Sequence, residues 1–318
     1  MLCQKLRTTN SSPTMTYTKD FSVIVPVWRG AIKFLPKLLD SIPQKVGIEI
    51  IVVDNSKEPV SREEIQSDRE ITFLHSAPER HAGGSRNVGM DAAQGKWLLF
   101  ADADDFYTDD AFDVYYSMLN TEAEIVYTGM GGIYEDTGEP SNRGDRYAKA
   151  VHDYLSGNLS EMNLRSHFSS PCCKMVSHEL VNRHHLRYDE VVASNDMYFS
   201  LLSGYYAKTI TAVDKITYIA TVNRGSLTRR RDLSVSMSRF KVLLRFNAFL
   251  REHGLSDYQS SVMQRYKDVC SNGIKATFKG ALLIVKYKQN PFIGYSRWFQ
   301  SFLNARSQEA KESKYITT

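Results

Sequence analysis

Three aspartates, Asp102, Asp104 and Asp105, carry the strongest chemical signal in this sequence. They directly follow residues 96–100, a run of large or apolar side chains that predicts a central parallel strand buried on both faces. Because buried carboxylates are costly, they must lie at the carboxyl end of that strand, where open α/β sheets bind ligands. Asp102 and Asp104 project to the same side of an extended chain. Two hard oxygen donors suit Mg²⁺ or Mn²⁺, with substrate phosphates completing the coordination, so we predict a metal site at Asp104 and Asp102.

The elements before and after this strand predict an α/β fold. Strand and helix patterns alternate in the first half, which is typical of a doubly wound, mainly parallel sheet. The second strand ends at Asp54, so Asp54 and Asp102 are expected at the same sheet edge. We expect strands over residues 21–27, 47–54, 71–75, 169–176, 209–213 and 216–222, a strand pair within 123–133, and helices over 32–42, 85–93, 147–155, 177–184 and 195–206, with helices dominating from residue 235.

Composition limits the class of protein. The 318 residues are 42% hydrophobic and 24% charged, as in ordinary globular proteins, and the net charge of +4 is too small to indicate nucleic-acid binding. Four cysteines without a CxxC spacing favour a reducing compartment. The polar start lacks a signal-peptide core, and no apolar run has transmembrane length, so a cytoplasmic protein is expected. We divide the chain into a disordered leader (1–19), a catalytic domain (20–230) and a helical C-terminal region (231–318).

The order of several motifs resembles glycosyltransferase family 2. These are V-I-V-P-V-W from residue 23, I-V-V-D-N-S from 51, G-G-S-R-N-V-G from 83 and L-L-F-A-D-A-D-D from 98. Later segments, P-C-C-K-M-V, L-R-Y-D-E, N-D-M-Y-F and R-G-S-L-T-R, extend the resemblance over roughly residues 20–230. It implies the GT-A fold, a nucleotide-diphosphate sugar donor, most often a UDP-sugar, inversion at the anomeric carbon, and a role in bacterial cell-surface polysaccharide or glycan synthesis.

The resemblance also implies roles in donor binding. Asp54 would bind the nucleotide base, although capping a turn with Asn55 and Ser56 is the structural alternative. Asp102 would contact the ribose or the metal, while Arg86 and Asn87 would line the donor site. Pro26, which ends the first strand, and Trp28, in the turn after it, would also contact the donor, and the Trp28 ring either stacks on the base or lies in the core.

The remaining roles fall in the second half. Asp196 is the candidate general base; the family usually has Glu-Asp here, and this chain has Asn195 and Asp196. We expect the helix N-terminus and nearby cations to favour its carboxylate form, and a plain helix cap is the alternative. Cations that could close over the diphosphate are Lys174, Arg224, Arg229, Arg230 and Arg231.

Several alternatives stay open at this stage. A non-catalytic sugar-nucleotide-binding protein of the same fold is the rival function, and a nucleotidyltransferase is a second. The acceptor is expected to be a glycan or a lipid-linked molecule, and a homo-oligomer is a further alternative.

Residues 269–308 contain no Asp or Glu but interleave basic and apolar residues. This pattern suits either peripheral contact with the inner face of the plasma membrane or helices packed on the catalytic domain.

Overall fold

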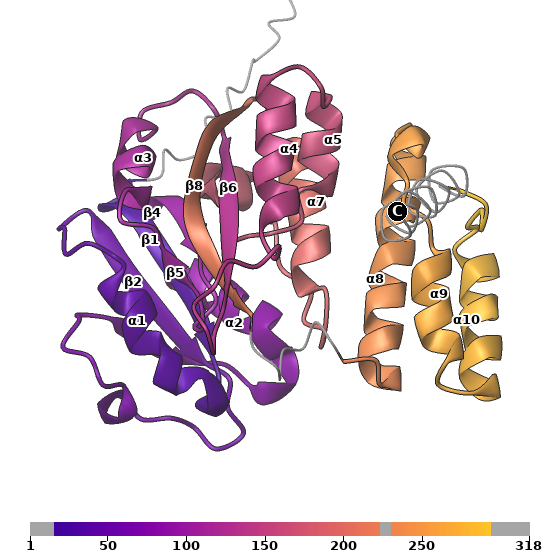
Figure 1. The fold of residues 1–318 in the computed structure, drawn as a ribbon, viewed down its shortest axis with the longest axis horizontal. Helices are drawn as coiled ribbons and strands as arrows, with labels where there is room; N and C mark the ends of the chain where they lie inside the picture. The colour runs from indigo at the N-terminus through magenta and orange to yellow at the C-terminus, as the bar shows by residue number, and fades with distance from the viewer. Residues whose placement is uncertain (1–15, 223–229, 294–318) are drawn as a thin grey trace, which may run out of the picture.

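The computed structural model describes residues 16–222 and 230–293, which fold around one mixed sheet of eight strands (Figure 1). The strand order is β3-β2-β1-β4-β7-β6-β8-β5. The strands are β1 (Lys19–Val27), β2 (Ile48–Asp54), β3 (Thr72–His75), β4 (Gly95–Phe100), β5 (Phe106–Tyr107), β6 (Ile125–Tyr134), β7 (Lys174–Ser177) and β8 (Ile210–Val222).

The first four strands pair in parallel, which brings their carboxyl ends to one edge. The register joins Val27 of β1 to Asp54 of β2, and Ile24 of β1 to Phe100 of β4. β4 is buried from Trp97 to Phe100, as the apolar run predicted. The α/β class with a mainly parallel first half is therefore confirmed, and the aspartate run follows β4 at this edge.

Helices cover both faces of the sheet and form the C-terminal region (Figure 1). The helix expected over residues 32–42 divides into a 3₁₀ segment, Arg29–Phe34, and α1, with Pro36 in its first turn where no internal bond is lost. The α-helices are α1 (Leu35–Asp40), α2 (His81–Ala92), α3 (Ala111–Ser117), α4 (Asp145–Leu155), α5 (Glu161–His167), α6 (His178–Arg183), α7 (Asn195–Tyr206), α8 (Leu233–Glu252), α9 (Met263–Cys270) and α10 (Ile274–Lys286).

The second half of the sheet differs from the sequence prediction. The strand pair expected within residues 123–133 is the single strand β6, and the two strands expected over 209–222 are one strand, β8. Thr128 of β6 pairs with Val213, and the next residue, Gly129, pairs with Ile216. The polar residues Asp214 and Lys215 therefore form a bulge, which their sequence pattern does not distinguish from a turn. β7 is shorter than expected and runs antiparallel to β4 and β6.

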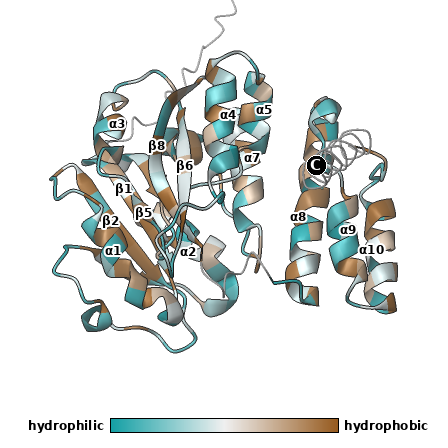
Figure 2. Cartoon of the chain, in the orientation of Figure 1, coloured by the Kyte–Doolittle hydropathy of each residue, from teal (hydrophilic) through white to brown (hydrophobic). Residues whose placement is uncertain are grey.

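Two hydrophobic cores meet at α7. One core surrounds the sheet, whose strands are predominantly hydrophobic (Figure 2), and the other joins α8, α9 and α10. Leu202 of α7 packs against both cores, and Leu201 belongs to the second. Across residues 16–222 and 230–293, no helix combines the length and the apolar character needed to cross a bilayer.

Candidate active site

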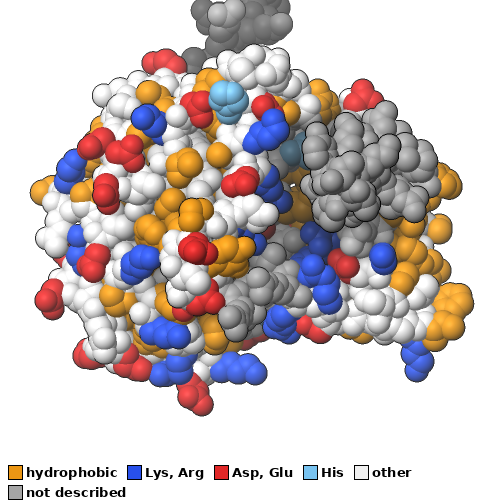
Figure 3. Space-filling model, in the orientation of Figure 1, with side chains coloured by type: hydrophobic (Ala, Val, Ile, Leu, Met, Phe, Trp, Pro, Cys, Tyr) orange, Lys and Arg blue, Asp and Glu red, His pale blue; other side chains and the backbone are white. Residues whose placement is uncertain are grey.

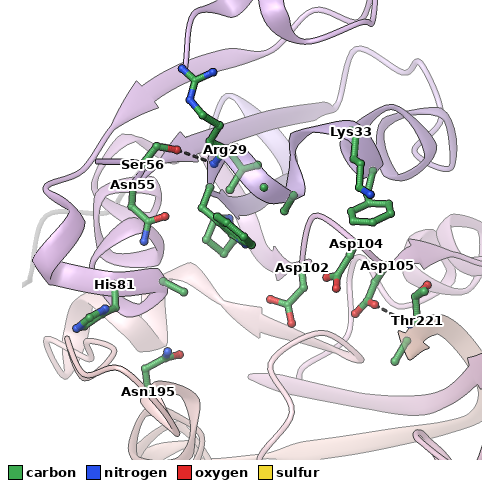
Figure 4. Close-up of a pocket in the computed structure, with 18 of the residues that line it drawn as sticks. Arg29, Lys33, Asn55, Ser56, His81, Asp102, Asp104, Asp105, Asn195 and Thr221 are labelled. Atoms are coloured by element: carbon green, nitrogen blue, oxygen red, sulfur yellow. Dashed lines mark hydrogen bonds between the residues drawn. The ribbon is translucent and has the colours of Figure 1, made fainter. Parts of the chain in front are cut away.

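A cleft of about 1780 Å³ opens at the carboxyl edge of the parallel strands. Its walls come from the ends of β1 and β4, the loop after β2, the start of α2, the end of β8 and the start of α7. This is the edge at which open α/β sheets bind ligands. Figure 4 shows that Asp102, Asp104 and Asp105 gather at one side of it, with Asn195 and His81 on another.

The three aspartates that follow β4 form the acidic side of the cleft. Burial and then the neighbouring Asp102 carboxylate raise the pKa of Asp104 to about 6. Burial, Asp104 and Asp102 raise the pKa of Asp105 well above its ordinary value. Asp105 accepts a hydrogen bond of 2.7 Å from the backbone N–H of Thr221, so its carboxylate ties the segment between β4 and β5 to β8 (Figure 4). The arrangement is a crowded group of carboxyl groups whose ionised form a cation would stabilise.

Arg86 connects the aspartate run to the start of α7. Its guanidinium donates to Oδ1 of Asp102 at 2.5 Å and to the side-chain oxygen of Asn195 at 2.8 Å. Burial alone would lower the pKa of Arg86, but the Asp102 carboxylate raises it above the ordinary value. The side chain is only 4% exposed, so this charge is held in place by its partners.

Gly83 allows α2 to approach the segment before α7 closely. A Cβ on Gly83 would lie 2.0 Å from the carbonyl oxygen of Asp189 and 3.1 Å from Cβ of Asn195. Only glycine permits this contact between α2 and the segment before α7. Gly83 and Gly84 lie inside α2 rather than ahead of it, so they form no phosphate-binding turn. Asn87 bonds the backbone of Tyr188 instead of lining the cleft.

Asp196 lines the cleft in the first turn of α7, beside Asn195. Ser194 adopts a left-handed conformation (φ 61°), which turns the chain into the helix. Burial raises the pKa of Asp196, while Arg86 opposes this increase. The expectation that the helix terminus and cations dominate is therefore wrong, because desolvation of the carboxylate outweighs them. The N-cap position of α7 is Ser194 and not Asp196, which lies in the first turn.

Pro26 and Trp28 both line the cleft where β1 ends. Trp28 is 61% exposed, so the core alternative is excluded. A Cβ on Gly30 would lie 2.1 Å from the Trp28 ring, which shows that the ring lies directly over Gly30. An exposed indole supported from beneath offers a flat face to a bound base.

Asp54 does not line the cleft, contrary to the sequence prediction. It is 1% exposed, and its carboxylate accepts bonds from the backbone N–H groups of Ser56 and Val60 and from the Ser56 hydroxyl. These bonds hold the loop that follows β2, and Asn55 and Ser56 from that loop line the cleft instead. The turn-capping alternative is the one that the structure supports.

Lys174 is also placed away from the cleft. It is 1% exposed, and its ammonium group donates to the carbonyl of Phe168 at 2.9 Å and to the Ser200 hydroxyl at 3.2 Å. Burial lowers its pKa to about 8. Because these bonds lie beneath α7, contact with the diphosphate is not supported, and Lys174 instead connects β7 to α7.

The basic loop is described only in part. Arg224 and Arg229 lie outside the described residues. Arg230 lines the cleft and pairs with Asp232 at 2.8 Å, whereas Arg231 lies 3.8 Å from Asp268 in α9.

The cleft also includes residues that the sequence analysis missed: His81, Arg143, Tyr134, Glu135, Asp136 and Thr221. Gly144, whose Cβ would lie 2.2 Å from the Met130 carbonyl, is a local signal for the packing of the loop that carries Arg143.

The residues present fit a divalent cation shared with a ligand. No group of three or more His, Cys, Asp and Glu side chains is placed to hold a metal within the described part of the chain. Asp102 and Asp104 both line the cleft, where burial and then the Asp102 carboxylate raise the pKa of Asp104. Mg²⁺ and Mn²⁺ are commonly bound by one or two carboxylates together with substrate phosphates.

Known proteins are similar to this chain in sequence and in fold. The family model described as glycosyl transferase family 2 matches residues 22–184. The glycosyltransferase GlyG of Streptococcus pneumoniae is 22% identical over 295 residues, covering 78% of this chain and 93% of that protein. The poly(ribitol-phosphate) beta-N-acetylglucosaminyltransferase TarS of Staphylococcus aureus is 24% identical over 216 residues, covering 64% of this chain and 36% of that protein. The chain thus spans about a third of TarS.

The fold matches a solved structure of the same relative. A crystal structure of S. aureus TarS residues 1–349 in complex with UDP-GlcNAc superposes with a TM-score of 0.55 at 18% identity. The match covers 80% of this chain and 71% of the TarS chain. At 18% identity, the similarity between the two structures shows a common fold, and it confirms the predicted GT-A architecture.

Proposed function

The chain belongs to glycosyltransferase family 2, and we propose that it transfers a sugar from a UDP-sugar to an acceptor hydroxyl in cell-surface glycan synthesis. The crystal structures of TarS, which has the same fold, include complexes with UDP and with UDP-GlcNAc. Its printed name identifies it as an N-acetylglucosaminyltransferase acting on poly(ribitol-phosphate). These relatives support a nucleotide-sugar donor and a surface-polymer context for this chain.

The observation that carries the proposal is the bridge made by Arg86. Its guanidinium binds Asp102 and Asn195 together, and Asn195 precedes Asp196 in α7. The cleft therefore joins two separate groups: the aspartate run on one side and the half-buried carboxyl of Asp196 on another. A donor diphosphate at the aspartate run and an acceptor hydroxyl near Asp196 would flank one reacting carbon.

Asp196 would serve as general base in a single displacement. The acceptor oxygen forms a bond to the anomeric carbon, the bond from this carbon to the diphosphate oxygen breaks, and Asp196 takes the hydroxyl proton. One displacement inverts the anomeric centre. The raised pKa of Asp196 brings its basicity closer to the working pH, which favours proton transfer. Most of the rate would come from positioning the acceptor and donor.

Asp104 and Asp102 would hold the Mn²⁺ or Mg²⁺ ion in this proposal. A bound divalent ion neutralises diphosphate charge and favours its departure. Arg86 donates a hydrogen bond that orients Asp102, and Trp28 offers the base an exposed ring. Asp54 contributes indirectly, because it holds the loop that carries Asn55 and Ser56 into the cleft.

A panel of nucleotide sugars tests the donor and the metal. We expect one UDP-sugar to raise the melting temperature in the presence of Mn²⁺ and to be slowly hydrolysed, since ligand binding to the folded state stabilises it. Asp104→Asn should fold normally and lose the Mn²⁺ dependence of donor affinity in calorimetry. A chain that binds no nucleotide sugar with either metal would contradict the proposal, and equal affinities in wild type and variant would remove Asp104 from the metal site.

A further inference from the structure

A second cavity of about 910 Å³ lies beside the donor cleft, between the segment before α7 and the helices α8 and α10. We call it the lysine groove. His81 and Val192 line both the lysine groove and the donor cleft, so the two spaces adjoin. The proposed function does not use this cavity.

The groove combines an apolar floor with a basic rim. Val192, Met237 and Val242 contribute to the floor, and Lys241, Lys275 and Lys279 contribute cations. Among its described lining residues there is no Asp or Glu, and the described part of the chain contains no ion pair for these three lysines. Arg245 also lines it but is bound to Asp189 at 2.9 Å. Figure 3 shows Lys and Arg side chains gathered around the hollow between the two parts of the molecule.

The wall between the two cavities is held firmly. Ser238 of α8 donates to the Ala193 carbonyl at 2.8 Å and accepts a bond from the Ala193 N–H. The left-handed turn at Ser194 then directs Asn195 and Asp196 into the donor cleft, while Val191 and Val192 face the groove. The lysine groove and the cleft that contains Asp196 are therefore separated by the single turn of chain around Ser194. A molecule that extends past this turn from the groove would reach the candidate base.

We propose that the lysine groove binds the phosphate group of an acceptor whose hydroxyl is presented to Asp196. This inference rests on the proposed function and adds the class of its acceptor. Three cations with no acidic partner among the described residues favour a ligand with more than one negative charge, and lysine is an effective point charge for phosphate. The apolar floor suits the uncharged part of the same molecule. The phosphate comes either from a soluble phosphate-bearing chain or from a phospholipid-type carrier.

Calorimetry with short inorganic polyphosphate tests the site, with saturating UDP present to occupy the donor cleft. The variant is Lys241→Gln/Lys275→Gln/Lys279→Gln. Its matched control is Lys208→Gln/Lys267→Gln/Lys286→Gln, which removes the same charge from exposed lysines outside the groove. We expect polyphosphate affinity to fall at least tenfold in the first variant and less than twofold in the control, with UDP affinity unchanged in both.

Vesicle flotation distinguishes the source of the phosphate. Vesicles of phosphatidylglycerol in phosphatidylcholine replace polyphosphate, with the same two variants. Groove-dependent binding to vesicles alone assigns the phosphate to a lipid, and groove-dependent binding to polyphosphate assigns it to a soluble chain. The proposal is overturned if neither probe binds, if both variants lose equal affinity, or if a poly-glutamate of similar charge binds equally well. Failure of UDP itself to bind would instead contradict the proposed function.

Discussion

Asp196 is a carboxyl group on which two opposing effects act. Burial raises its pKa, and the Arg86 guanidinium opposes that increase. The ionised form needed in a general base is therefore reached at a higher pH than for an ordinary aspartate, whose pKa is about 3.9. The family resemblance identified the residue, but the balance of these effects depends on the folded surroundings.

Replacing Asp196 with Asn tests its role as base. We expect near-normal folding and donor affinity, with the transfer rate reduced by about 10²-fold or more, the typical contribution of general base catalysis. In wild type the rate should fall as the pH decreases through a pKa above the ordinary aspartate value, because protonation removes the base. Rate measurements across pH check both expectations. Asp214→Asn, outside the cleft, is the control. A variant with the wild-type rate would exclude Asp196 as base.

Lys174 predicts a pH dependence of stability. The pKa of Lys174 in the folded protein is about 8, whereas that of an unperturbed lysine is 10.5. Between these values the unfolded chain holds more protons than the folded chain, so the free energy of unfolding rises with pH across this window. Across the whole window, the free energy of unfolding should rise by about 3 kcal/mol. Lys174→Met keeps the volume and removes the charge, so wild type should gain stability relative to this variant from pH 8 to 10.5 in urea denaturation. A constant difference would contradict the pKa shift.

At the scale of elements, α10 presents two different faces. Ala276 is buried in the second core, and Leu283 and Ile284 pack against it, whereas Ile274, Phe278, Leu282 and Val285 are each at least 67% exposed. Their spacing places the exposed side chains on one stripe of the helix. Hydrophobic side chains gather at this edge of the molecule in Figure 3. One face of α10 therefore packs against α8 and α9, and the other face is open.

The open face of α10 predicts peripheral binding to anionic membranes. Apolar side chains would enter the headgroup region, and each nearby lysine would contribute about 1 kcal/mol. Phe278→Glu/Leu282→Glu should abolish flotation with phosphatidylglycerol vesicles. Val46→Glu/Ile216→Glu, on exposed apolar residues elsewhere, should retain it. Equal flotation of both variants would contradict membrane contact through α10. Deleting α10 is a poorer test, because its buried face belongs to the second core.

At the scale of the whole molecule, α7 and α8 connect the catalytic sheet to the C-terminal helices. Phe246 of α8 is 1% exposed, and its ring lies 5.9 Å from that of His167 in α5. Leu202 of α7 packs against both cores, and α7 also carries Asp196 at its start. The geometry of the site thus depends on packing that crosses the expected boundary near residue 230.

Phe246→Ala tests whether the two parts unfold together. Loss of a buried phenylalanine costs about 3–5 kcal/mol, and we expect one cooperative urea transition shifted by this amount. Phe278→Ala, at a residue that is 67% exposed, should change stability by less than about 0.5 kcal/mol. Two separate transitions, with only one shifted, would instead show that residues 20–230 and 231–318 are independent units.

The local pattern of the sequence was enough to place the parallel half of the sheet. Buried strands such as β4 are read from continuous apolar runs, and carboxylates that follow such a run must lie at its exposed end. Trp28, Arg86, Asp102, Asp104 and Asp196 were all identified by type and motif, and all of them line the cleft. The strand positions and the motif residues could be identified because each depends on residues that are neighbours in the chain.

Tertiary structure alone decided which way other side chains point. Asp54 and Lys174 were expected at the ligand, but turn and helix groups bind their charges beneath the surface. Arg86 meets Asn195 across 109 positions in the chain, and Gly83 permits that approach only because of the backbone opposite it. The lysine groove likewise forms from α8, α10 and the segment before α7. Such contacts join residues far apart in the chain, so their geometry is set by the packing of the folded molecule and leaves no periodic signal in the sequence.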